Sequence, residues 1–147
     1  MPDPIPQPMD AQTQELLRRP NYAHLATIRP DGSPKMDPIW VVVEDPSTVL
    51  MTTSLASPKT QNLLRDPRCA LSIIDAENPY EHCQIEGVAT VEQDVAMAMK
   101  DEMSLKYTSA PFPMRDDDSN RVILRMTVTR SRYASMPLTH NPTASER

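Results

Sequence analysis

The segment from Ser57 to Asn62 carries the residues of this 147-residue chain that are best suited to hold a phosphate group. Ser57 can cap a helix with its hydroxyl, and Pro58 suits the first helical position. The first turn of a helix has unpaired main-chain N–H groups and a partial positive charge. Lys59 adds a full positive charge there, and Thr60 adds a second hydroxyl. The segment indicates a phosphate site; an ordinary capped helix with a solvated lysine is the alternative.

Three more side chains could take part in chemistry, each with an ordinary structural role as the alternative. Tyr80 can cover the flat ring of a ligand, and His82 can transfer a proton near neutral pH. Trp40, the single tryptophan, stands in the most apolar segment, where a core position is favoured over a ligand platform. No Ser-His-Asp or Cys-His set can be assigned from spacing, so Tyr80 and His82 are the candidates for proton transfer.

The shortage of glycine excludes the common phosphate loops. The chain contains only two glycines, Gly32 and Gly87, against 16 prolines. Neither the dinucleotide-binding fingerprint nor the P-loop can be written without its glycines. A phosphorylated ligand would therefore have to be held by a helix N-terminus such as the one at Ser57.

Charge and cysteine content exclude several other classes of protein. Fifteen Lys and Arg against 20 Asp and Glu give a net charge of −5, which argues against a nucleic-acid-binding protein. Cys69 and Cys83 are too few for a disulfide framework, and no spacing of Cys and His indicates zinc. The run Asp116–Asp118 lacks the spaced ligands of a calcium loop, so we expect it to be solvated. The sequence predicts no metal site.

The termini and the hydropathy pattern favour a cytoplasmic protein with reduced thiols. The first eight residues are neither basic nor apolar, so they are no signal peptide. No apolar run approaches the roughly 20 residues that a membrane span needs. We expect a flexible proline-rich arm over residues 1–9, one domain over 10–136 and a flexible tail over 137–147.

Helix-capping residues predict three helices. Asp10 is expected to cap a short helix that ends before Pro20, and Ser57 a second that ends before Pro67. Asp94 is expected to cap a third and longer helix. Apolar side chains at helical spacing follow Asp94, and they form a predicted packing stripe: Ala96, Met99, Met103 and Tyr107.

Six segments have the composition of strands and predict a mainly β fold. The β-branched run in residues 39–43 is typical of a strand buried on both faces, and residues 83–92 alternate as in a half-buried antiparallel strand. The connections among the first three strands are too short for parallel crossovers, so these strands form a meander. We predict a six-stranded antiparallel β-barrel with flanking helices, since a barrel leaves no exposed edge. The predicted strands are residues 22–28, 36–44, 48–54, 69–74, 83–92 and 121–129.

Five short segments, in order along residues 20–134, resemble the pyridoxamine 5′-phosphate oxidase-like, flavin-binding split-barrel superfamily. One is similar to the K-x-x-N-L-x-R-D-P-R segment of that superfamily, and another to its D-x-x-N-P-Y block followed by I-x-G. The others are similar to its opening hairpin, to its second strand and to a helix end. In this chain the segments are Asn21–Pro34, Pro38–Trp40, Lys59–Arg68, Asp75–Tyr80 with Ile85–Gly87, and Lys106–Thr108.

The branch that the chain resembles most uses coenzyme F-420, a deazaflavin, as a hydride donor. The resemblance implies a six-stranded split barrel of the FMN-binding type and a homodimer with cofactor at the subunit interface. It implies that Lys59 and Asn62 hold the phosphate end of the cofactor and that Tyr80 packs near its ring from the other subunit. The remaining positions carried over are Thr52, Thr53 and Ser57 on the approach to the helix, with Thr60 beside them, and Pro38, Ile39 and Trp40 along the ring.

The activity implied is reduction of an electron-poor double bond in a small organic substrate, with the proton supplied by water, His82 or Tyr80. One departure stands out, because related sequences often carry Arg just before the lysine where this chain has Ser57 and Pro58. A phosphate thereby loses a bidentate partner. Two alternatives stay open: an FMN-dependent oxidase or flavin reductase on the same fold, and a non-enzymatic dimer that binds a cofactor or haem.

Overall fold

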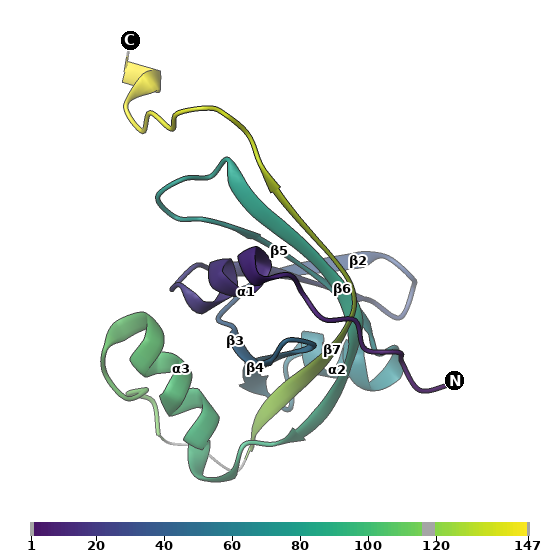
Figure 1. Ribbon diagram of the computed structural model, residues 1–147. Coiled ribbons are helices and arrows are strands. Elements are labelled where there is room, and N and C mark those ends of the chain that lie inside the picture. Colours follow the sequence, from purple (N-terminus) through teal and green to yellow (C-terminus); the bar gives the residue numbers. More distant parts are fainter. Residues whose placement is uncertain (1, 116–119, 147) are drawn as a thin grey trace.

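The structure is a computed structural model that describes residues 2–115 and 120–146; the Asp116–Asp118 run predicted to be solvated lies outside these residues. Its elements are α1 (Ala11–Arg18), β1 (Ala23–Ile28), β2 (Pro34–Ile39), β3 (Val42–Asp45), β4 (Thr48–Ser54), α2 (Pro58–Arg65), β5 (Arg68–Ile74), β6 (Glu81–Gln93), η1 (Val95–Met97), α3 (Ala98–Thr108), β7 (Arg121–Ser135) and η3 (Ala144–Glu146). Within the described residues, seven antiparallel strands form one curled sheet in the order β2-β1-β5-β6-β7-β4-β3 (Figure 1). The predicted mainly β, antiparallel fold with flanking helices is confirmed.

The single strand predicted over residues 36–44 is wrong, because the chain breaks at Trp40 and Val41 into β2 and β3. β2 pairs with β1, whereas β3 pairs with β4 at the other end of the strand order, so the meander is also divided. Val42 and Val43 are only half-buried, so the run is not covered on both faces. The bend at Trp40 carries the chain from one end of the strand order to the other, which is why the barrel has seven strands instead of six.

The N-terminal helix α1 begins at the cap that the sequence predicts, and it covers the core. The Asp10 carboxylate accepts a hydrogen bond from the Thr13 N–H at 2.7 Å, as its predicted capping role requires. Leu16 and Leu17 are fully buried. The inner end of the preceding arm is held as well, since Gln7 N–H donates to the Val128 carbonyl oxygen and Met9 is buried.

The helix α3 begins later than Asp94 predicts. Ala96 and Met97 both have positive φ angles, 55° and 57°, and reverse the chain before the helix starts at Ala98. The buried Asp94 carboxylate nevertheless caps it, accepting from the N–H groups of Met99 and Lys100 at 2.9 Å each. Ala96, predicted in the packing stripe, is therefore exposed, and Met97 is buried instead.

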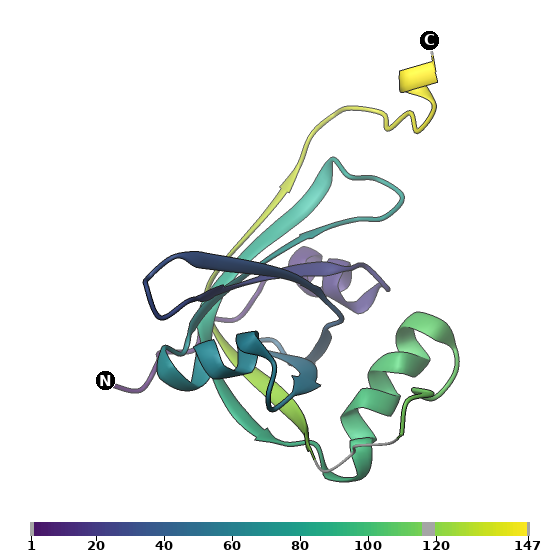
Figure 2. The same ribbon diagram turned by 180° about the vertical axis from the view of Figure 1, so that it is seen from behind.

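Figure 2 shows α3 beside one end of the barrel and the hairpin of β5 and β6 projecting at the other end. β6 and β7 are the longest strands, and a bulge at Glu86 and Gly87 shifts their pairing. After β7 the chain runs away from the barrel to the C-terminus. Within the described residues, no helix is long and apolar enough to cross a membrane.

Candidate functional site

A hollow of about 350 Å³ lies where α2, α3 and the start of β7 meet the barrel, and three positive side chains line it. We call it the cationic pocket. Six of the residues predicted for cofactor binding line it, namely Pro38, Ile39, Trp40, Thr52, Thr53 and Lys59, together with Tyr22, Lys100 and Arg121. The structure thus brings together residues from five separate elements and from the bend between β2 and β3.

Main-chain pairing places the charged residues of the cationic pocket. Arg121 pairs with Ser54 in the ladder of β4 and β7, which puts it near the chain leading into α2. The Asp94 N–H donates to the Arg121 carbonyl oxygen at 2.9 Å and ties the connection before α3 to the same point. Lys100, in the first turn of α3, is thereby brought to the pocket that also holds Lys59 from α2.

Trp40, which lines the cationic pocket, belongs to a cluster of aromatic rings. The Trp40 ring stacks on Tyr107 with centroids 5.2 Å apart and planes 6° apart, and Phe112 meets Trp40 edge-on at 6.4 Å. The Lys100 ammonium lies 4.8 Å from the Trp40 centroid and 4.5 Å from the Phe112 centroid. The Arg121 guanidinium lies 5.1 Å from the Phe112 centroid. Within the described residues, cation–π contacts and not carboxylates hold these two positive groups.

The electrostatics of the cationic pocket favour an anion. Among the described residues, no carboxylate forms an ion pair with Lys59, Lys100 or Arg121. Burial, with the charges of Arg121 and Lys59, lowers the pKa of Lys100 to about 8, and the charge of Asp94 acts in the opposite direction. A neighbouring anion would relieve this repulsion between positive charges.

The hydroxyls at the start of α2 bond to one another. Ser57 Oγ lies 2.9 Å from Thr60 Oγ1 and accepts hydrogen bonds from the Thr60 N–H and the Thr53 hydroxyl. Thr60 Oγ1 donates to the Ser54 carbonyl oxygen at 2.7 Å, and Thr60 is fully buried. Ser57 and Thr60 are not among the residues that line the pocket, so they fix the helix start that carries Lys59.

Asn62, predicted to hold a phosphate, has a structural position in this chain. It is buried, its amide donates to Thr27 Oγ1 at 3.0 Å, and its side-chain oxygen accepts from Arg65 at 3.3 Å. The bond to Thr27 joins α2 to β1, and the bond from Arg65 lies within α2. The geometry gives Asn62 no place on the cationic pocket, because both ends of its amide already have partners.

Tyr80 and His82 lie away from the cationic pocket within this chain. Tyr80 belongs to the loop between β5 and β6, and its ring lies 6.5 Å from that of His140. His82 lines a small hollow of about 80 Å³ with Cys83, Gln84, Arg132 and Ala134. A role for either residue at the pocket would need a second subunit.

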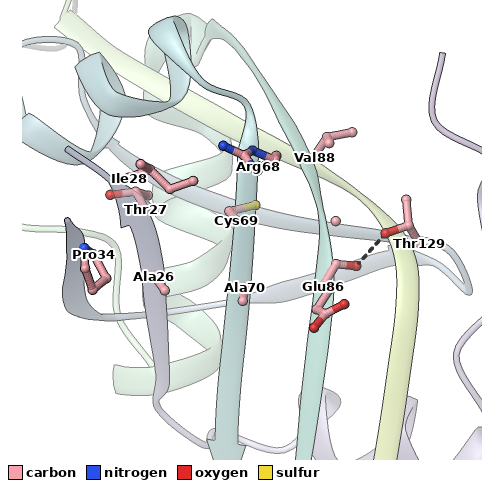
Figure 3. A pocket seen from close by; sticks show the side chains of 11 residues that line it. Ala26, Thr27, Ile28, Pro34, Arg68, Cys69, Ala70, Glu86, Val88 and Thr129 are labelled. Carbon is pink, nitrogen blue, oxygen red and sulfur yellow. Dashed lines mark hydrogen bonds between the residues drawn. The ribbon is translucent and has the colours of Figure 1, made fainter. Parts of the chain in front are cut away.

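A larger hollow, of about 420 Å³, crosses β1, β5, β6 and β7, but its lining offers few side chains that could react with or bind a ligand (Figure 3). It exists because Ala26 faces Ala70 on neighbouring strands, so small side chains leave space. Arg68 already pairs with Asp66, and burial raises the pKa of Cys69 to about 12. Among the described residues, no group of three or more His, Cys, Asp or Glu could hold a metal ion.

Sequence reasoning missed Lys100, Arg121 and Tyr22 as residues of the pocket. Lys100 had one local signal, since it lies near the start of the helix predicted to follow Asp94. Arg121 begins a predicted strand, and nothing in its neighbours shows that it pairs beside Ser54. These two cations supply positive charge that Ser57 and Pro58 do not provide.

Several known proteins resemble the chain. The pyridoxamine 5′-phosphate oxidase family model matches residues 9–135. Among solved structures, an F-420 reductase shares 29% sequence identity at a TM-score of 0.75, covering 87% of this chain and 98% of that chain. The conserved hypothetical protein Rv2991 from Mycobacterium tuberculosis shares 25% identity at a TM-score of 0.74, covering 99% and 98%. General Stress Protein 26 from Bacillus anthracis, at 20% identity and a TM-score of 0.66 over 84% and 91%, shows a likeness of fold alone. No curated protein matches the chain.

Proposed function

Because the chain belongs to the pyridoxamine 5′-phosphate oxidase family, we propose that it is an oxidoreductase that uses reduced coenzyme F-420 to transfer hydride to a small unsaturated organic substrate. The observation that carries the proposal is the cationic pocket, in which three positive side chains without carboxylate partners in the described structure stand beside the stacked ring of Trp40. A phosphorylated, flat cofactor has the matching chemistry, with an anionic end and an aromatic ring. The likeness to an F-420 reductase at 29% identity supports this choice of cofactor.

The residues present fit such a cofactor. Lys59 is available for an anionic group, because no described residue pairs with it. Trp40, Pro38 and Ile39 offer an apolar boundary, and β2 is a terminal strand of the order, so one of its main-chain edges has no strand partner in the part of the chain that the structure describes. That edge can bond the polar rim of a ring. The bound cofactor would supply hydride, and this chain would orient it, hold its charge and exclude water.

The proposal includes a homodimer in which Tyr80 of one subunit approaches the pocket of the other. Its support is the family resemblance and the position of Tyr80, which lies away from the pocket of its own chain. Light scattering should give twice the 16.5 kDa mass of the chain. Tyr80→Ala should weaken cofactor binding and leave the dimer intact. A monomer at working concentration would contradict this part of the proposal.

An FMN-dependent oxidase or flavin reductase is the second candidate. The family model that matches the chain is that of an oxidase, and the same three cations suit the single phosphate of FMN. The haem-binding alternative has less support, because the described residues that line the pocket include no histidine or cysteine.

Binding titrations of the purified protein with F-420, FMN and haemin separate the three functions. Saturable F-420 binding without FMN binding supports the proposal, whereas tight binding of FMN alone overturns it. Lys59→Met should weaken F-420 binding about 10- to 100-fold, because a charge-assisted hydrogen bond contributes about 1.5–3 kcal/mol. Arg130→Met is the matched control, since it removes the same charge from a residue 80% exposed and outside the pocket. Equal affinity of both variants would remove Lys59 from the site.

A further inference from the structure

Lys100 and Arg121 enter the cationic pocket from elements other than the helix at Ser57. Lys100 stands in the first turn of α3, and Arg121 is the first residue of β7. Both contact the Phe112 ring, at 4.5 Å and 5.1 Å from its centroid, so they form a pair of positive charges around one aromatic side chain. Lys59 lines the same pocket from α2 and, within the described residues, makes no cation–π contact with the Phe112 ring.

The surroundings of Lys100 are positive and aromatic. Lys59 on α2 and Arg121 on β7 both act on it with like charge. Among the residues that the structure describes, the acidic group that acts on it is Asp94, in the connection before α3, and both oxygens of that carboxylate accept from main-chain N–H groups. Trp40 and Phe112 present uncharged rings. Two cations held together without a carboxylate partner are costly unless an anion joins them.

We propose that Lys100 and Arg121 form a second anion subsite of the cationic pocket, for a carboxylate or phosphate group additional to the anion at Lys59. The ligand, or a pair of ligands bound together, then carries two separate anionic groups. The inference rests on the proposed function only in assigning these anionic groups to a cofactor or its substrate. The subsite could bind an anion even if the protein used neither that cofactor nor that substrate. It also accounts for how this chain binds an anion without the arginine that related sequences carry before the lysine.

Anion binding at this subsite should be coupled to protonation of Lys100. The pKa of Lys100 is about 8, so its ammonium is mostly charged at pH 7 and mostly neutral at pH 9. Sulfate is a suitable probe because it keeps its charge over this range. If the charged form alone binds, sulfate affinity at pH 9 should be about tenfold weaker than at pH 7.

Trp40 supplies a local reporter, because it is the only tryptophan of the chain and the Lys100 ammonium lies 4.8 Å from its ring centroid. Sulfate should change Trp40 emission, and calorimetry at constant ionic strength should give the affinity. In Lys100→Met the tenfold pH dependence should disappear, whereas the control Arg130→Met should keep it. Lys59→Met should keep a pH dependence with its midpoint shifted upward, because Lys59 is a neighbouring like charge. Arg121→Met should weaken sulfate binding and shift the Trp40 titration midpoint upward, since a neighbouring like charge is removed.

Two results would overturn the subsite. One is sulfate affinity in Lys100→Met equal to that of the unaltered protein, with the pH dependence retained. The other, independent of whether that variant folds, is sulfate binding to the unaltered protein with no pH dependence and no change in Trp40 emission. Failure of F-420 to bind would remove the proposed function and leave the sulfate result standing.

Two further titrations identify the source of the anion. If the subsite takes the cofactor, Lys100→Met should weaken F-420 binding about tenfold and leave binding of its phosphate-free deazaflavin chromophore unchanged. If it takes a substrate anion, Lys100→Met should leave F-420 binding unchanged and weaken sulfate binding to the F-420-loaded protein. Unchanged affinity in all these titrations would contradict the proposal.

Discussion

Replacing Tyr107 by Phe tests how the pocket is held together. The Tyr107 hydroxyl donates to the Asn21 carbonyl oxygen at 2.7 Å and accepts from the Val41 N–H at 3.2 Å. Val41 is fully buried at the bend between β2 and β3, and Asn21 is also buried. The variant loses two net hydrogen bonds and leaves a buried N–H without a partner, which together should lower the free energy of unfolding by about 2–3 kcal/mol.

Urea denaturation measures this change. For an m-value of about 1–3 kcal/mol per molar urea, the unfolding midpoint of Tyr107→Phe should fall by about 1 M. Emission of Trp40 is the local probe, because its ring stacks on Tyr107 at 5.2 Å, and circular dichroism is the global one. Coincident transitions by both probes justify treating the unfolding as two-state.

Tyr22→Phe is the matched control for this experiment. The Tyr22 ring also contacts Tyr107, with centroids 5.5 Å apart, but it is 56% exposed and lines the pocket opening. Its change in unfolding free energy should stay within about 0.5 kcal/mol. If both variants had the same midpoint, the hydrogen bonds of Tyr107 at the bend would contribute nothing measurable, and the reasoning would be refuted.

Three other predictions concern the barrel and its buried groups. Gly87→Ala should destabilise the protein by about 1–3 kcal/mol, measured by thermal unfolding, because a Cβ there overlaps the main-chain oxygen of Thr127 on the paired strand. Burial lowers the pKa of Lys106 to about 8, so the folded protein loses this proton at lower pH than the unfolded chain does, and its contribution to stability should rise as pH increases from 7 to 8.5. Lys100, whose pKa is also about 8, contributes a similar rise, so Lys106→Met should lose about half of the total rise in urea titrations. Burial raises the pKa of Cys69 and Cys83 to about 12, so iodoacetamide at pH 8 should label both in urea and neither in the folded protein, as mass spectrometry would show.

Local signals predicted much of the fold. Asp10 and Ser57 cap α1 and α2 as expected, because a cap needs only a side-chain oxygen and an N–H three residues away. The alternation of residues 83–92 correctly indicated a strand with one buried face. Turn residues at 30–33 correctly marked the hairpin of β1 and β2. Each of these features depends on neighbours within a few positions of the chain.

The break in the predicted strand at Trp40 depends on contacts with residues that are distant in sequence. Residues 39–43 all have high strand propensity, so nothing local marks a break at Trp40. The bend there is stabilised by Lys106, whose ammonium donates to the Val41 carbonyl oxygen at 2.7 Å, and by Tyr107. These partners lie 65 and 66 positions away in sequence. A strand propensity cannot report contacts of that separation, since it describes only how a residue suits a pleated surface.

The candidate site likewise has some features that the sequence determined and others that only the tertiary structure decided. The sequence alone determined that a lysine stands at the start of a capped helix, that no glycine loop is present, and that a strand precedes the helix. Only the tertiary structure decided that Lys100 and Arg121 join Lys59, and that Asn62 turns to Thr27 instead. The physical reason is that strand register and helix docking bring these residues together, and both are set by burial of the whole core.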